Sequence, residues 1–167
     1  MKKNILYITL IFALCFGIKA QAQNIIGYQA KLSNLSNTQA EQLNHLIRGA
    51  STTIYVTTQN EAELFKGNTV QVSVMKVTQS RDFAKLTGQF SNQLNEVTAL
   101  SIDWDGQEEL VIPTGLIDLL PNLKYIYIQS YEVLNQTVIQ NRFSNLLNQL
   151  NGNTTVEVLF YTMEQPS

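Results

Sequence analysis

The chain has 167 residues, of which 44% are hydrophobic and 14% charged, with 11 basic and 13 acidic side chains and a net charge of −2. This length suits a single domain with its own core, and the lack of any run of Lys and Arg argues against nucleic acid and anionic lipid as partners. The one cysteine, Cys15, lies in an apolar N-terminal stretch, so the rest of the chain has no thiol for a disulfide or a cysteine-ligated zinc site.

Residues 1–22 have the three-part layout of a secretory signal peptide. Met1 to Lys3 form a basic start, Ile5 to Ile18 are almost wholly apolar, and Ala20 to Ala22 end on the small residues that a signal peptidase recognises. The apolar stretch is shorter than the roughly 20 residues of a membrane-spanning helix. We expect cleavage between Ala22 and Gln23, export to the periplasm or the exterior, and no membrane insertion afterwards. An uncleaved N-terminal anchor is the alternative.

After cleavage, eight basic and 13 acidic side chains remain, because Lys2, Lys3 and Lys19 are removed, and the net charge becomes −5. Residues 23–37 are predicted to be a polar lead segment, and residues 38–167 a single domain. The first predicted helix begins at Thr38, which has capping-box spacing with Glu41, and ends at Gly49. Apolar stripes predict two more helices, Ser80 to Leu94 and Thr137 to Leu150, the last ending at Asn151-Gly152.

Short β-branched and aromatic runs alternate with these helices and predict an α/β chain with parallel strands. The predicted strands are Thr53 to Thr57, Val70 to Val77, Ala99 to Trp104, Lys124 to Gln129 and Val156 to Tyr161. In each, apolar residues alternate with polar residues or tyrosine. A sheet covered on both faces would have unbroken apolar strands instead. We therefore expect a parallel sheet with helices on one face.

A repeat supports this interpretation. Val97-x-x-Leu100-x-Ile102 recurs as Leu123-x-x-Ile126-x-Ile128, at an offset of 26 residues, within the roughly 20–29 residues of one leucine-rich repeat. An Ile-Pro turn at Ile112-Pro113 and the stretch Leu120 to Tyr125 separate the two copies.

Residues 97–131 thus resemble a leucine-rich repeat, and the resemblance implies a short βα stack with irregular capping units. Asp105 and Tyr131 stand where the family places an asparagine. The alternative is a one-sided α/β sheet with a chance local match.

The segment from Asp103 to Glu109 is the one acidic cluster, and Asp103, Asp105 and Glu108 are weak candidates for a calcium site. The cluster lacks a third alternating ligand, so a strand end running into a solvated turn is the favoured interpretation. His45 is the only histidine and has no cysteine or second histidine to join it in a metal or catalytic site. The sequence therefore predicts no cofactor, no metal and no catalytic residue.

The strongest candidate for a ligand-binding surface is the sheet face opposite the predicted core. If Leu100, Ile102, Ile126 and Ile128 point inward, alternation sends the intervening side chains outward. The predicted ligand-binding residues are Tyr55, Ser73, Ser101, Asp103, Tyr125, Tyr127, Gln129 and Tyr161. Tyrosine mixed with small polar residues is typical of recognition surfaces, although tyrosine is also common on half-exposed strands.

The sequence therefore favours an exported, non-enzymatic binding or interaction module whose partner is a protein or glycan in the periplasm or at the cell surface. Two alternatives remain open. One is a small extracytoplasmic hydrolase or metal-dependent enzyme that uses Asp103, Asp105 and Glu108. The other is a structural component of the cell envelope. The leading hypothesis requires one face of the sheet to be free of helices.

Overall fold

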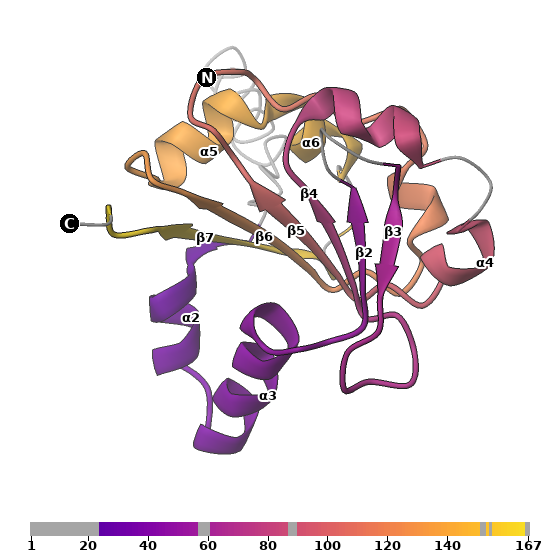
Figure 1. Ribbon diagram of the computed structural model, residues 1–167. Helices are drawn as coiled ribbons and strands as arrows, with labels where there is room; N and C mark the ends of the chain where they lie inside the picture. Colours follow the sequence, from indigo (N-terminus) through magenta and orange to yellow (C-terminus); the bar gives the residue numbers. More distant parts are fainter. Residues whose placement is uncertain (1–23, 57–60, 87–89, 151–152, 154, 166–167) are drawn as a thin grey trace, which may run out of the picture.

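The computed structural model describes residues 24–56, 61–86, 90–150, 153 and 155–165. A seven-stranded sheet with the order β1-β7-β6-β5-β4-β2-β3 forms its centre (Figure 1). The strands are β1 (Ile25–Gly27), β2 (Thr53–Val56), β3 (Glu63–Phe65), β4 (Val74–Val77), β5 (Ala99–Asp103), β6 (Tyr125–Ser130) and β7 (Glu157–Thr162). Every neighbouring pair in this sheet is parallel except β2 and β3. The predicted α/β class with a mostly parallel sheet is confirmed. The predicted signal peptide, with its cleavage site between Ala22 and Gln23, lies outside the described residues.

Strands β4 to β7 are neighbours in chain order, and the segments that connect them pack on one face of the sheet. These segments are η1 (Ser80–Lys85), α4 (Ser91–Leu94), η3 (Ile117–Leu119), α5 (Gln136–Arg142) and α6 (Ser144–Gln149). They build the main core with the inward side chains of the strands. The 26-residue repeat is in register, because Leu100 lies opposite Ile126 and Ile102 opposite Ile128, all with no exposed surface.

The other face of the sheet is partly covered by α2 (Tyr28–Ser33) and α3 (Asn37–Arg48) (Figure 1). Tyr28 and Leu43 from these helices form a second apolar cluster with Tyr127 and Leu159 of the sheet. An ion pair of 2.6 Å between Lys31 Nζ and Glu157 Oε2 also fastens α2 to β7.

The prediction of helices on one face only is therefore wrong, and the topology gives the reason. Strand β1 lies at one edge of the sheet, while β2, the next strand in the chain, lies almost at the other edge. The connection between them must cross β7, β6, β5 and β4. The later connections occupy the opposite face, so α2 and α3 cross over the face that was expected to be free.

The N-terminal boundary also differs from the prediction. Residues 23–37, expected to be a polar lead, contain β1 and α2, and Tyr28 is 1% exposed. The N-cap of helix α3 is Ser36, two residues before the predicted Thr38. Ser36 Oγ accepts from Gln39 N (3.4 Å), and Gln39 Oε1 accepts from Ser36 N (3.2 Å), which completes a capping box. The predicted end at Gly49 is confirmed.

Strand β4 is shorter than predicted, and its register is shifted by one residue. Val74 faces α3, and Met75 and Val77 face the main core, whereas Val70 is fully exposed. The shift arises because the preceding residues form a loop tied to Thr52, whose backbone N donates to Thr69 Oγ1 (2.9 Å). A period of two in the sequence does not distinguish this loop from strand.

Two of the predicted helices are interrupted. The stretch Ser80 to Leu94 forms the 3₁₀ helix η1 and the short helix α4, with residues 87–89 outside the described ranges. The stretch Thr137 to Leu150 forms α5 and α6, which are separated at Phe143. Phe143 is completely buried and packs edge-on against Trp104, with ring centroids 5.3 Å apart. Because this ring is buried at the break, it anchors both helices to the core. The predicted helix end at Asn151-Gly152 lies outside the described residues.

Candidate functional site

Seven of the eight predicted ligand-binding residues share one face of the sheet. Cross-strand registers align Tyr55, Lys76, Ser101 and Tyr127 in one row, and Asp103, Gln129 and Tyr161 in the next; Tyr125 lies on the same face two residues before Tyr127. Ser73 is the exception. It precedes β4 and its carbonyl accepts from Thr98 N (2.9 Å), so it belongs to the edge where the strands begin.

The face is not open along its whole length. Tyr127 is 1% exposed, and Tyr125 and Tyr161 pack against the cluster formed by α2 and α3. Ser101 is 4% exposed, whereas Tyr55, Asp103 and Gln129 are only half-buried. The helices therefore cover the face over β6, β7 and part of β5, and they leave it incompletely covered over β2, β4 and the end of β5.

A groove of about 270 Å³ lies in this incompletely covered region, between the end of α3 and the sheet. The last turn of α3 forms one wall and the sheet forms the other, and each wall carries polar or aromatic side chains. The residues that line it are Leu46, Ile47, Arg48, Gly49, Thr53, Tyr55, Val74, Lys76, Ser101, Tyr127 and Gln129. Four of the predicted ligand-binding residues thus line one hollow, and Asp103 binds two of its lining residues.

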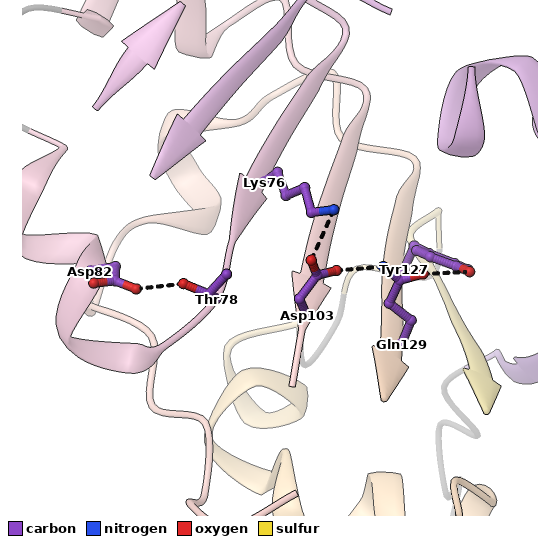
Figure 2. A network of polar contacts seen from close by, with 6 residues as sticks. All are labelled: Lys76, Thr78, Asp82, Asp103, Tyr127 and Gln129. Atoms are coloured by element: carbon purple, nitrogen blue, oxygen red, sulfur yellow. Dashed lines mark hydrogen bonds and ion pairs between the residues drawn. The ribbon is translucent and has the colours of Figure 1, made fainter. Parts of the chain in front are cut away.

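A continuous chain of polar contacts crosses this groove from α3 to β4. Arg48 Nη2 donates to Tyr127 Oη (3.1 Å), and Tyr127 Oη donates to Gln129 Oε1 (3.2 Å). Gln129 Nε2 then donates to Asp103 Oδ1 (2.6 Å), and Asp103 Oδ2 pairs with Lys76 Nζ (2.8 Å). Figure 2 shows the part of this chain that lies on β4, β5 and β6. Each group is held by its neighbours, so the polar surface of the groove has a defined geometry.

The same view shows a separate contact at the end of β4, where Thr78 Oγ1 donates to Asp82 Oδ2 (2.9 Å) (Figure 2). Asp82 is completely buried and also accepts from Gln79 N (3.1 Å). These bonds cap the first turn of η1 on the core side of the sheet. Asp82 therefore stabilises the turn after β4 and is not part of the groove.

Arg48 is held by aromatic rings as well as by its hydrogen bond. Its guanidinium carbon lies 4.2 Å from the ring centroid of Tyr161 and 5.0 Å from that of Tyr28. Such cation–π contacts are worth about 0.5–1 kcal/mol each at exposed sites. Arg48 is not among the predicted ligand-binding residues, because an arginine in the last turn of a helix commonly complements the helix dipole. No local signal indicates the three distant tyrosines around it.

Burial raises the pKa of the Tyr127 hydroxyl, and the nearby Arg48 opposes this shift in part. Burial likewise raises the pKa of Tyr28, again against the influence of Arg48. For Arg48, burial disfavours the charge, but hydrogen bonds with Tyr127 and Tyr161 help to raise its pKa overall. At neutral pH Arg48 is therefore charged, and the hydroxyls of Tyr28 and Tyr127 are neutral.

The acidic cluster does not come together as a metal site. Asp103 faces Lys76 and Gln129 on the sheet, whereas Asp105 lies in the following loop, where its Oδ1 accepts from Gln107 N (3.0 Å). Glu108 is exposed, and its carbonyl accepts from Trp104 Nε1 (2.7 Å). Within the described ranges, no three His, Cys, Asp or Glu residues are grouped so that they could hold a metal ion. His45 is exposed on α3.

Two other hollows lie near the sheet. One, of about 310 Å³, lies beside α3 where β5 and β6 begin, and includes Leu35, Leu43 and Tyr125. The other, of about 510 Å³, lies beside β3 and the loop that follows it. Neither contains a chain of hydrogen-bonded charged and aromatic groups like the one in the groove, so the groove is the strongest candidate site.

No model of a protein family, no curated protein and no solved structure matches this chain. Within the part of the chain that the structure describes, no helix is long and apolar enough to cross a membrane.

Proposed function

We propose that this protein is an exported, non-enzymatic binding module and that the groove beside α3 receives part of a protein or glycan partner. The observation that carries the proposal is the hydrogen-bonded chain from Arg48 to Lys76, which runs through the hollow at the incompletely covered end of the sheet. Polar groups held in place before a ligand arrives lose little conformational entropy on binding.

The composition of the groove also supports recognition. Tyr55 is half-buried and packs edge-on against Phe65, with ring centroids 6.1 Å apart, so its ring has a fixed orientation at the rim. Rigid tyrosines supply contact area at a low entropic cost, and neighbouring Ser and Gln side chains supply adaptable hydrogen bonds. Ser101 and Gln129 provide such groups on the floor of the groove.

Export is part of the proposal and rests on residues 1–22, with their basic start, apolar stretch and small residues before Gln23. We also propose that β4 to β7 form a leucine-rich-repeat-like stack. Support comes from the in-register 26-residue repeat on β5 and β6 and from the consecutive order of these strands. The α2–α3 segment and the antiparallel β3 then correspond to irregular ends.

The proposal is tested with a glycan array and a peptide display library as defined probes, followed by calorimetric titration of the tightest ligands. We expect Tyr55→Ala and Gln129→Ala to weaken binding at least tenfold, or about 1.4 kcal/mol. Tyr131→Ala is the matched control, because Tyr131 is 51% exposed and does not line the groove. If neither probe set yields a ligand, or if all three variants bind equally well, the groove is not the binding site.

The two alternatives remain predictions. A hydrolase that uses Asp103, Asp105 and Glu108 predicts activity that is lost in Asp105→Asn. A structural role in the envelope predicts co-purification with envelope fractions, without a saturable ligand for the groove.

A further inference from the structure

The charged side chains that line the groove are all basic. They are Arg48 and Lys76, and no Asp or Glu among the described residues belongs to the lining. This contrasts with the chain as a whole, which carries a net charge of −2. A small hollow with locally positive walls in an otherwise acidic protein favours an anionic ligand.

Arg48 and Lys76 differ in how their charges are compensated. Lys76 pairs with Asp103 at 2.8 Å, and this pair is about 70% shielded from solvent, with 28% and 30% of the two side chains exposed. Arg48 has no carboxylate partner among the ion pairs of the described residues. It contacts Tyr28, Tyr127 and Tyr161, none of which is a carboxylate, so its charge remains available to a ligand.

The guanidinium of Arg48 also has spare hydrogen-bonding capacity. It carries five N–H donors in a planar fork that suits a carboxylate, and its hydrogen bonds with Tyr127 and Tyr161 use only part of this set. The C-terminal end of α3 carries a partial negative charge, which Arg48 offsets, and hydrogen bonds to the last carbonyls reduce it further. Ser51 Oγ lies 3.3 Å from both His45 O and Leu46 O, and Gly49 N donates to His45 O (2.9 Å).

We propose that the groove binds one acidic sugar unit of a glycan, with the sugar's carboxylate on Arg48 and its hydroxyls on Lys76, Ser101 and Gln129. This inference rests on the proposed function and names the ligand class of the same site. The volume of about 270 Å³ lies just below the roughly 300–1,000 Å³ of pockets for drug-sized ligands, so it suits a single ring.

The surroundings favour a sugar over an acidic peptide. The floor of the groove is a sheet face, where the backbone groups of β2, β4, β5 and β6 are already paired with one another. A peptide entering the groove would find few partners for its own amides. Sugar hydroxyls need only side-chain donors and acceptors, and the groove provides these from three strands, next to the ring of Tyr55.

The test uses oligosaccharides that contain a uronate or a sialic acid, each paired with its carboxyl-reduced counterpart, and a set of acidic peptides. Binding is measured by calorimetry at low and at physiological salt. We expect the acidic member of at least one pair to bind at least tenfold more tightly than its reduced partner. Arg48→Gln should remove this preference, and Arg48→Lys should retain part of it.

Arg142→Gln is the matched control, because Arg142 is an exposed arginine on α5, against the other face of the sheet. It removes the same charge and should leave the preference unchanged. Circular dichroism of each variant shows whether it is still folded. Amide chemical shifts of Ser101 and Gln129, followed while the wild-type protein is titrated with the acidic sugar, show whether the sugar contacts the groove.

The other outcomes overturn the inference in distinguishable ways. Equal binding of acidic and reduced sugars in the groove leaves the proposed function intact but removes the role of the carboxylate. Tighter binding of acidic peptides assigns the groove to a protein partner. An equal loss in Arg48→Gln and Arg142→Gln indicates general charge attraction, and no binding by any of these sugars refutes the ligand class.

Discussion

Val77→Ala is expected to lower the free energy of unfolding by about 2 kcal/mol, whereas Val70→Ala is expected to change it by less than about 0.5 kcal/mol. Both substitutions remove the same two methyl groups. Val77 has no exposed surface and belongs to the main core, while Val70 is fully exposed in the loop before β4. Removing two buried carbons at about 0.8 kcal/mol each gives about 1.6 kcal/mol, and the cavity left behind adds to this.

The assay is urea unfolding followed by fluorescence. Trp104 is the single tryptophan, is 7% exposed and packs on Phe143, so its emission reports on the loss of the core. With a slope of about 2 kcal/mol per molar urea, Val77→Ala should move the midpoint down by about 1 M. Both variants should keep the slope of the native protein.

An equal shift in the two variants, or a larger one in Val70→Ala, would refute the register of β4. The sequence periodicity alone predicts that larger effect for Val70, because it places Val70, Val72 and Val74 on the buried face. The pair of variants therefore separates the two registers directly.

Three further predictions use the same assay. Leu100→Ala and Ile126→Ala, which remove fully buried side chains, should each cost about 2–5 kcal/mol, and midpoint shifts below about 0.5 M for both would place these residues at the surface. Tyr127→Phe keeps the ring 5.1 Å from that of Tyr28 but removes the hydroxyl between Arg48 and Gln129. It should therefore lower the free energy of unfolding by about 1–3 kcal/mol. An unchanged midpoint would mean that the polar chain is not formed. Because burial raises the pKa of Tyr28 and of Tyr127, the folded state keeps these protons to higher pH than the unfolded state. The free energy of unfolding should thus be at its full value below about pH 10 and decline as the pH rises through the folded-state pKa values, in step with late phenolate absorbance; loss of all tyrosine protons near pH 10 would contradict this.

The central strands could be predicted from the sequence because their pattern is local. Each of β5 and β6 places alternate residues in the main core, and Leu100, Ile102, Ile126 and Ile128 are all fully buried. The repeat spacing of 26 residues also brings equivalent residues opposite each other. A local period of two and a repeat length are sufficient to find such strands.

The coverage of the sheet could not be predicted in this way, because it depends on where a three-residue strand pairs. Ile25–Gly27 is too short to give a periodic signal, yet its position beside β7 decides that α2 and α3 cross the second face. The site has the same non-local origin. Arg48 and Tyr127, which join the helix to the sheet, are 79 residues apart in the chain.

The groove exists because α3 ends where it does. The helix lies over β5 and β6 and stops at Gly49. An added Cβ at Gly49 would overlap His45 O, so the glycine allows the tight turn that leads into the buried residues Ser51 and Thr52. The same helix that buries Tyr127 therefore leaves the end of the polar chain accessible and places Arg48 at its margin. In this fold, the partial coverage that removes the expected free face also produces the candidate binding groove.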